Sequence, residues 1–220
     1  VTINAGVEAF VNLNSTPKYT VTNNNTVTVE PGYYIIVDGG PVEDLTGYSL
    51  NIVQVVGEIN ITPKNGTVEF DKKLKDKNDT TGDVSGWQDS ADYDIGDEIP
   101  FRLRAKIASD YGNYKTYYLA FHDEEEATLE FQSVSSVKIY RDGAAVETLV
   151  KDVDYTVVTS DLDDNCTFEV ILSELKDTGA KADDEIIVEY TSKLKDTAVH
   201  GKQGNVNKAK LEYSNNPNNE

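Results

Sequence analysis

The chain of 220 residues has little material for a disulfide framework or a metal centre. It contains one cysteine and two histidines, which excludes an internal disulfide and a cluster of thiolate ligands. His122 and His200 stand far apart in the sequence and are expected to be surface residues. No metal site and no cofactor is therefore expected.

Positive charge is scarce as well. The chain has 20 lysines and arginines against 39 acidic residues, a formal net charge of −19. This excess repels phosphate backbones and anionic lipids, so a nucleic-acid partner and a role at a membrane surface are disfavoured. The longest wholly apolar run, Tyr33 to Val37, is too short to cross a bilayer.

Common enzyme signatures are missing too. The sequence has no glycine-rich phosphate loop, no G-x-S-x-G elbow and no H-E-x-x-H motif. It has thirteen tyrosines, fifteen glycines and no methionine, which is typical of a secreted β-rich protein. Neither end carries a signal or an anchor, so we expect a piece of a longer exported protein that is located at the cell surface.

Apolar and polar residues alternate along most of the chain. Phe101, Leu103, Ala105 and Ile107 alternate with basic residues, which predicts a half-buried strand. The same period of two predicts strands at 33–37, 50–56, 119–121, 166–172 and 186–190, and a short one at 27–29. Short strands separated by glycine and asparagine turns predict an all-β protein with an immunoglobulin-like β-sandwich.

A domain boundary is expected near the turn at 63–66. Residues 1–65 would form a small N-terminal β domain. Residues 66–220 would form the sandwich, which has a common domain size.

Three predicted strands each place one polar residue on a face that is otherwise apolar. Lys72 follows Val68 and Phe70 at alternate positions, and Asp123 follows Leu119 and Phe121. Asn215 follows Ala209, Leu211 and Tyr213 at alternate positions.

Lys, Asp and Asn together have a known chemical use. A buried lysine loses its proton and becomes a nucleophilic amine, while a buried carboxylic acid stays protonated and can hydrogen-bond a carbonyl. The amine can then displace ammonia from the Asn carboxamide and leave a Lys–Asn isopeptide bond. The alternative for each residue is a place at a strand end, where burial relaxes and lysine reaches solvent.

The sequence also resembles a known family, the fimbrial isopeptide-forming domain of Gram-positive backbone pilins. The resemblance runs in order from about Gly66 to the C-terminus and is carried by four segments: 71–76, 86–97, 121–123 and 211–217. It implies a sandwich of the collagen-adhesin type, in which a Lys on the first strand joins an Asn on the last with the help of an acid.

Position by position, the resemblance implies Lys72, Asn215 and Asp123, with Lys73 and Asn216 as open alternatives. The acidic run after Asp123 departs from the more apolar run that is usual in the family.

The segment 61–65 resembles the junction at which backbone pilins carry a Tyr-Pro-Lys-Asn motif. The resemblance implies that Lys64 is a sortase acceptor, although Thr62 replaces the tyrosine. Pro63 and the Asn65-Gly66 turn should leave Lys64 exposed.

Two functions compete at this point. The first is a structural subunit of a covalent surface pilus, which has other pilin subunits as partners and modifies itself once rather than acting as an enzyme. The second is an adhesin or carbohydrate-binding module that binds host or glycan ligands through aromatic residues: Trp87, Tyr111, Tyr114, Tyr117 and Tyr118. Cys166, on the same predicted face as Phe168 and Val170, is expected to be a buried and unreactive thiol.

Overall fold

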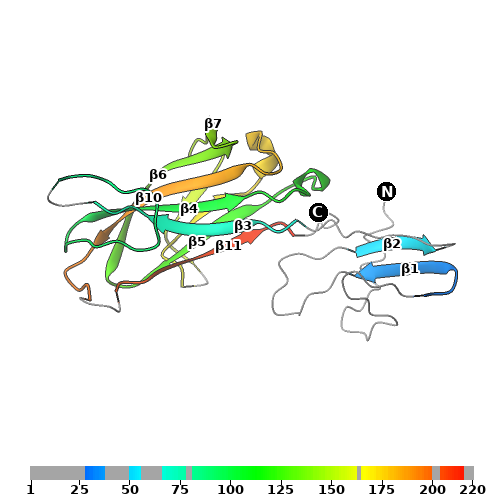
Figure 1. Ribbon diagram of the computed structural model, residues 1–220, viewed down its shortest axis with the longest axis horizontal. Coiled ribbons are helices and arrows are strands. Elements are labelled where there is room, and N and C mark those ends of the chain that lie inside the picture. The colour runs from blue at the N-terminus through cyan, green and yellow to red at the C-terminus, as the bar shows by residue number, and fades with distance from the viewer. Residues whose placement is uncertain are drawn as a thin grey trace. The chain divides into compact units, whose positions relative to one another are not determined.

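The computed structural model of the chain describes residues 28–37, 50–55, 66–77, 81–162, 165–199 and 204–215 (Figure 1). The chain divides into two compact units, and the second runs from Gly66 to Ser214. None of the helices within the described ranges is long and apolar enough to cross a membrane.

In the first unit, two antiparallel strands are described. β1 (Gly32–Val37) pairs with β2 (Leu50–Val55) from Gly32 opposite Val55 to Val37 opposite Leu50. Both strands agree with the sequence pattern. The short strand predicted at 27–29 is not formed at Thr28 and Val29, and Val27 lies outside the described residues.

The second unit contains two antiparallel sheets. The five-stranded sheet has the order β3-β4-β10-β6-β7, with these bounds: β3 Glu69–Leu74, β4 Glu98–Lys106, β10 Glu185–Leu194, β6 Leu129–Arg141 and β7 Ala144–Thr148. The four-stranded sheet has the order β11-β5-β9-β8, with these bounds: β11 Asn207–Tyr213, β5 Leu119–Glu125, β9 Phe168–Leu172 and β8 Thr156–Val158.

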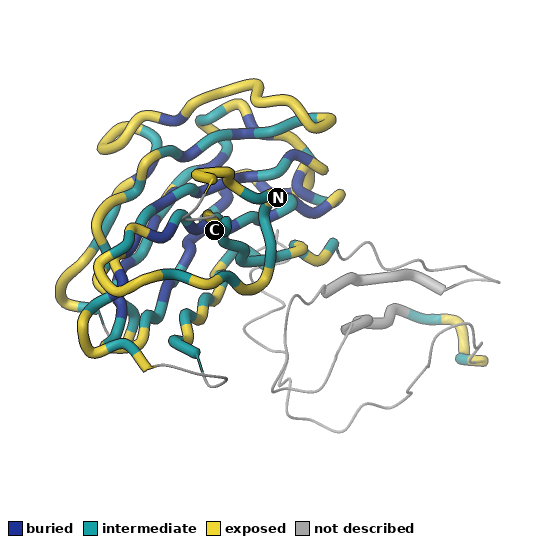
Figure 2. The backbone as a smooth tube through the Cα atoms, turned by 60° about the vertical axis from the view of Figure 1, so that its left-hand side comes forward, coloured by how far each residue is buried: buried dark blue, intermediate teal, exposed yellow. Residues whose placement is uncertain are grey.

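Buried residues alternate with more exposed ones along strands of both sheets (Figure 2), and the buried residues form one core. The five-stranded sheet contributes the buried side chains of Phe101 and Leu103 of β4 and Val188 of β10. The four-stranded sheet contributes those of Phe121 and Val170. Aromatic contacts cross between the sheets, since the ring centroids of Phe168 and Tyr190 lie 4.9 Å apart. The second unit is therefore a β-sandwich, as the alternation predicts.

Only two short 3-10 helices occur among the described residues: η1 at Tyr111–Asn113 and η2 at Leu175–Thr178. The predicted all-β class is thus confirmed. The strands β6, β7 and β8 were not predicted. Bulges opposite β10 interrupt the alternation of β6, and every residue of β7 is exposed.

The first and last strands of the sandwich lie at the edges of their sheets. β3 begins the five-stranded sheet and β11 begins the four-stranded sheet. The Lys72 Nζ of β3 donates a hydrogen bond to the Lys208 carbonyl of β11 at 3.1 Å, so the two edges are neighbours (Figure 1). This contact brings residues that are far apart in sequence to one side of the core.

Candidate functional site

Lys72 is held on the inner face of β3, opposite Leu103 of β4. Its side chain is 14% exposed, and its Nζ lies 2.7 Å from Asp123 Oδ2. The Nζ also lies over the rings of Phe101 and Tyr190, 5.4 and 5.8 Å from their centroids. The amine is thus enclosed by an acid, a carbonyl and two aromatic faces.

Lys73, the open alternative, points to the other face of β3. Its Nζ pairs with Asp89 Oδ1 at 2.5 Å, and the Asp89 side chain is 82% exposed. The structure therefore separates the two lysines: one faces the core acid and the other faces a surface acid.

Asp123 lies on β5 with a fully buried side chain. Its Oδ2 accepts hydrogen bonds from the Lys72 amine and, at 2.8 Å, from the Tyr190 hydroxyl. Tyr190 lies on β10 of the other sheet, so the acid is fixed from both sheets.

The asparagine at this site is Asn207, the first residue of β11. Its Nδ2 donates to the Tyr190 hydroxyl at 3.1 Å and lies 3.5 Å from Glu125 Oε1. The Tyr190 hydroxyl therefore bridges Asp123 and the Asn207 carboxamide. The sequence reasoning did not select this residue.

The structure does not bring Asn215 to this site. The Lys72 amine meets β11 at Lys208, and a strand advances about 3.3 Å per residue. Ser214, which still bonds to the Tyr118 carbonyl, is therefore about 20 Å farther along the strand, and Asn215 follows it. The alternative Asn216 lies outside the described residues.

Asn207 rather than Asn215 lies near Asp123 because of the direction in which β11 runs along β5. Asn207 and Asn215 have the same parity, so both belong to the set that alternation assigns to the inner face. Alternation fixes the face but not the end of the strand. The antiparallel register decides the end, because Ala209 lies opposite Asp123 and Asn207 opposite Glu125. The signal in the sequence was an Asn two residues before the apolar set of β11.

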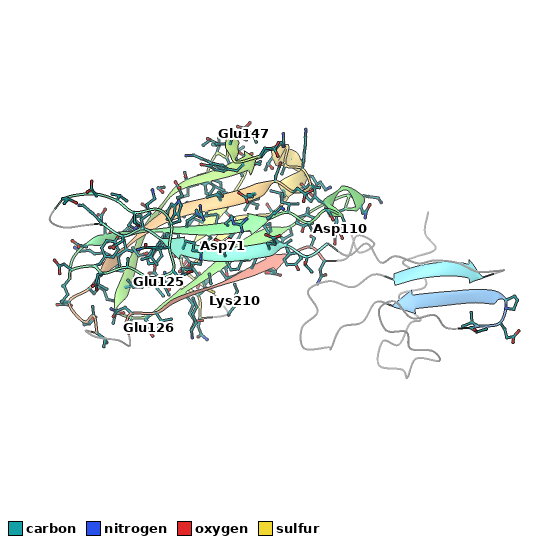
Figure 3. All side chains as sticks on the ribbon, viewed as in Figure 1. Asp71, Asp110, Glu125, Glu126, Glu147 and Lys210 are labelled. Carbon is teal, nitrogen blue, oxygen red and sulfur yellow. The ribbon has the colours of Figure 1, made fainter. Side chains whose placement is uncertain are left out.

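Glu125 is a second acid at the site and was also missed by the sequence reasoning. Figure 3 shows Glu125 and Glu126 at the end of the sandwich where β11 begins. The Glu125 Oε1 accepts a hydrogen bond from the buried Ser192 hydroxyl, in addition to its contact with Asn207. The unusual acidic run that follows Asp123 in the sequence thus places one carboxyl group next to the carboxamide.

Burial controls the ionisation of these groups. It lowers the pKa of Lys72 more than the attraction of Asp123 and Glu125 raises it. It raises the pKa of Asp123 more than Lys72, Tyr190 and Asn207 lower it. It also raises the pKa of Glu125 to about 7, although Ser192 acts in the other direction. These directions favour a neutral amine beside a protonated acid.

Two polar atoms at the site support this protonation state. Asp123 Oδ1 and Asn207 Oδ1 are buried and have no hydrogen-bond partner among the described residues. Both are acceptors when Asp123 is ionised, and an unsatisfied buried acceptor is costly. Protonation of Asp123 at Oδ1 would turn one of these two unsatisfied acceptors into a donor.

The other residues singled out by the sequence lie elsewhere. Lys64 falls outside the described residues. Tyr111, Tyr114 and Tyr117 are buried and stack edge-to-face on one another, so these three are core residues and no ligand contacts. Trp87 contacts two cations, since Lys75 Nζ and the Arg102 guanidinium carbon lie over its ring, 4.7 and 5.0 Å from the centroid.

His122 and Cys166 lie together, contrary to the expectation from sequence. Cys166 is half-buried and precedes β9, whereas Phe168 and Val170 are buried as predicted. The prediction of a buried thiol is wrong because alternation applies only within a strand, and β9 begins at Phe168. Cys166 is beside His122 and Glu169 instead.

The comparisons with known proteins point to pilins. Residues 95–217 match the family profile described as Gram-positive pilin backbone subunit 2, Cna-B-like domain. Curated protein sequences give no significant match.

Similar solved structures are also pilins. The full-length major pilin SpaD of Corynebacterium diphtheriae is 23% identical with a TM-score of 0.57, over 86% of this chain and 44% of that chain. The T6 backbone pilin of serotype M6 Streptococcus pyogenes is 19% identical with a TM-score of 0.53, over 87% and 43%. The 35 kDa C-terminal fragment of the major pilin GBS80 of Streptococcus agalactiae is 23% identical with a TM-score of 0.50, over 68% and 50%. The chain spans half or less of the length of these structures, and at such identities the likeness shows the fold.

Proposed function

The chain belongs to the family of Gram-positive pilin backbone subunits, and on this basis we propose that it is a structural subunit of a covalently assembled cell-surface pilus. We further propose that its sandwich is crosslinked by an isopeptide bond between Lys72 Nζ and Asn207 Cγ. The observation that carries the second proposal is the buried constellation of Lys72, Asp123 and Asn207 at the neighbouring edges of the two sheets.

The reaction is an amide exchange. The neutral Lys72 amine attacks Asn207 Cγ, a C–N bond forms, and the bond from Cγ to Nδ2 breaks. One proton passes from the attacking nitrogen to the departing one, so that ammonia leaves and a secondary amide remains. The chain carries out this step once, so it is a self-modifying protein and no turnover enzyme.

Asp123 serves as the acid. Its proton polarises the Asn207 carbonyl and stabilises the negative charge that develops on Oδ1. This role agrees with the two buried acceptor atoms at the site and with the direction of the pKa of Asp123.

Glu125 is placed at the other end of the carboxamide. Its Oε1 faces Asn207 Nδ2, the atom that leaves as ammonia. A carboxyl group with a pKa of about 7 can both take up and give a proton near neutral pH. We therefore assign Glu125 the transfer of the proton to the leaving nitrogen.

Folding supplies the rest of the rate enhancement for this amide exchange. An amine and a carboxamide do not exchange at a useful rate in dilute solution. Held at one site by two packed sheets, where both groups are linked through Asp123 and Tyr190, they react with a high effective concentration. The fold thus acts as the template for its own crosslink.

The partners follow from the family. We propose that other pilin subunits are joined to this chain by sortase, with Lys64 as the acceptor amine, and that the assembled pilus lies outside the cell on the cell wall. The boundary near residue 65 would then separate an N-terminal pilin domain from the crosslinked one. No observation favours the alternative of an adhesin, because three of its five aromatic contacts are buried in the core.

The test is peptide mapping of the native protein. Digestion followed by tandem mass spectrometry should give one branched peptide that joins the segment around Lys72 to the segment around Asn207. A branch to Asn215, or linear peptides alone, would contradict the proposed bond. Matched digests of Asn207→Ala and Asn215→Ala should give linear peptides for the first variant and the wild-type branch for the second.

A further inference from the structure

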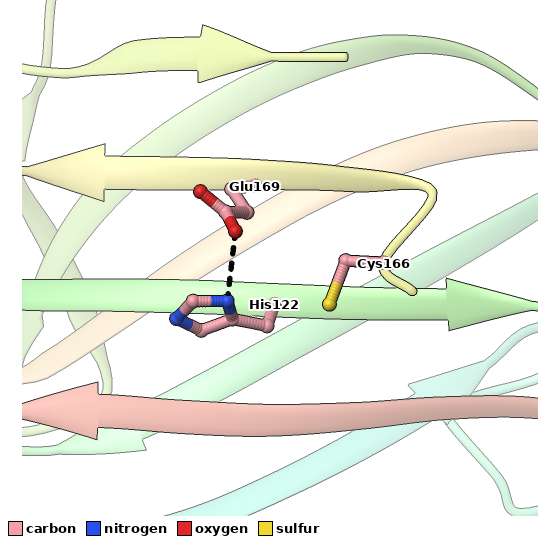
Figure 4. A group of neighbouring side chains, drawn as sticks. All are labelled: His122, Cys166 and Glu169. Atoms are coloured by element: carbon pink, nitrogen blue, oxygen red, sulfur yellow. Dashed lines mark ion pairs between the residues drawn. The ribbon is translucent and has the colours of Figure 1, made fainter. Parts of the chain in front are cut away.

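Three side chains of metal-binding types meet on the outer face of the four-stranded sheet. His122 of β5 lies directly opposite Glu169 of β9, and Cys166 precedes that strand by two residues (Figure 4). Their neighbours Phe121 and Val170 point into the core, so His122 and Glu169 point away from it. This cluster shares no residue with the Lys72 site.

The three ligand atoms are close together. One nitrogen, one sulfur and one carboxylate oxygen all lie within 4.8 Å of one another, and His122 Nδ1 is 3.1 Å from Glu169 Oε1. In a tetrahedral zinc site with bonds of about 2.0 to 2.3 Å, ligand atoms lie about 3.3 to 3.8 Å apart. Side-chain rotations that move the ligand atoms by about 1 Å would therefore bring all three within bonding distance of one ion.

Glu212 supplies a contact of the kind that orients metal-binding histidines. Its Oε2 lies 3.4 Å from His122 Nε2, on the side of the ring opposite Glu169. Metal-binding histidines usually donate their second ring N–H to a carboxylate, which fixes the tautomer. With the proton held on Nε2, the lone pair of Nδ1 faces Glu169 and Cys166.

The ligand set selects the kind of ion. A thiolate with an imidazole and a carboxylate suits zinc and similar thiophilic divalent ions, whereas calcium and magnesium require oxygen ligands. The site is also open to ions, because the side chains of His122 and Glu169 are 13% and 15% exposed. The net charge of −19 favours the approach of a cation.

We propose that His122 Nδ1, Cys166 Sγ and Glu169 bind one zinc-class divalent cation, with water as the fourth ligand. Binding converts the thiol to a thiolate and releases one proton. The ion would fasten the segment before β9 to β5. This proposal does not depend on the isopeptide bond.

Cobalt(II) is the probe for a direct test. Titration of Co²⁺ into protein pretreated with a chelator should give a thiolate-to-cobalt charge-transfer band that saturates at one ion per chain. Zn²⁺ should abolish the band by displacement. The absence of a saturating band, or a band that Zn²⁺ does not displace, would overturn the proposal.

Variants assign the ligands. Cys166→Ser should remove the band, and His122→Gln and Glu169→Gln should each weaken binding at least tenfold. Glu212→Gln should weaken binding about tenfold, because the carboxylate that contacts His122 Nε2 is lost. Glu189→Gln, on β10 of the other sheet, should leave binding unchanged, and circular dichroism should verify that every variant is folded. Binding that survives both His122→Gln and Glu169→Gln would mean that the thiol alone binds cobalt and would contradict the site.

Discussion

Lys72 and Asp123 touch at 2.7 Å, yet they do not behave as an ordinary salt bridge. In a surface ion pair, the lysine pKa rises and the aspartate pKa falls. Here burial is the largest cause for both groups and acts in the opposite direction. Both directions favour the neutral forms of the two groups, which the proposed reaction requires.

Replacement of the acid tests this account at a single residue. In Asp123→Ala, the carbonyl of Asn207 loses its proton donor, and we expect bond formation to slow by about 10² to 10⁴-fold. The time course of ammonia loss measures this rate, followed by mass spectrometry as each protein first folds from chains isolated unfolded, before the bond has formed. Asp89→Ala, which removes the partner of Lys73, is the control and should react at the wild-type rate. A wild-type rate in Asp123→Ala would exclude Asp123 as the acid.

Glu125 predicts a dependence of stability on pH. Its pKa is raised from 4.5 to about 7 in the folded protein, so the folded state holds this proton more tightly than the unfolded state does. The contribution of Glu125 to the stability of the fold is then fully present below about pH 4.5 and is lost as the pH rises through about 7. Lys72→Met prevents the crosslink. It also leaves the pKa of Glu125 raised, because the substitution removes a charge that lowers this pKa.

We therefore expect the free energy of unfolding of Lys72→Met to fall by about 2 kcal/mol more than that of Lys72→Met/Glu125→Gln between about pH 5 and pH 8. Urea denaturation at each pH measures the difference, in which the other titrating groups cancel. Parallel pH profiles for the two variants would show that Glu125 is not buried in the way described.

At the scale of strands, the face and the end of each element decide which residues can react. Lys72 and Lys73 are neighbours on β3 but lie on opposite faces, and Asn207 begins β11 whereas Asn215 lies beyond the other end of that strand. These two pairs provide matched controls within one chain.

We expect Lys72→Ala and Asn207→Ala to abolish the crosslink completely, and Lys73→Ala and Asn215→Ala to retain it. Migration in denaturing gels gives a quick reading, because a chain closed on itself is more compact than a linear one. Loss of the bond in Asn215→Ala, or its persistence in Asn207→Ala, would restore the assignment made from the sequence alone.

The sequence was sufficient to predict strands in which every second residue is buried. β4, β5 and β10 each bury every second residue against the core, and the pattern of the chain contains that periodicity. β6 could not be predicted in this way because its bulges shift the register against β10. β7 is exposed along its whole length, so it has no apolar face to detect.

Local patterns could point to only part of the candidate site, for the same reason. Lys72 and Asp123 stand out as polar residues in the middle of apolar faces. Asn207 stands at the start of its strand, and its place beside Asp123 follows from a register between β5 and β11 that local patterns do not contain. His122 and Cys166 meet only because β5 pairs with β9, which is again a long-range relation.

At the scale of the whole molecule, the proposed bond would join the edges of the two sheets. It would link β3, the first strand of the sandwich, to β11, the last. Tension applied at the two ends of the second unit would then pass through the bond, and the residues between 72 and 207 would carry none of it. A shaft that bears load along its length needs this property.

The crosslink should also stabilise the fold against denaturants. Closing the loop from residue 72 to residue 207 restricts the unfolded chain, and by analogy with disulfides this contributes about 5 kcal/mol. We expect wild type to unfold at a clearly higher urea concentration than Asn207→Ala. Addition of a reducing agent should not change this difference, because an amide bond is not reduced as a disulfide is. Equal midpoints for the two proteins would mean that no covalent closure is present.

The central claim is that Lys72 and Asn207 are joined with the loss of ammonia, and the intact mass of the purified native protein tests it most directly. The account predicts a mass lower than that of the linear sequence by one ammonia in wild type, and the full mass in Asn207→Ala. A wild-type protein that folds and retains the full mass of its sequence would contradict it.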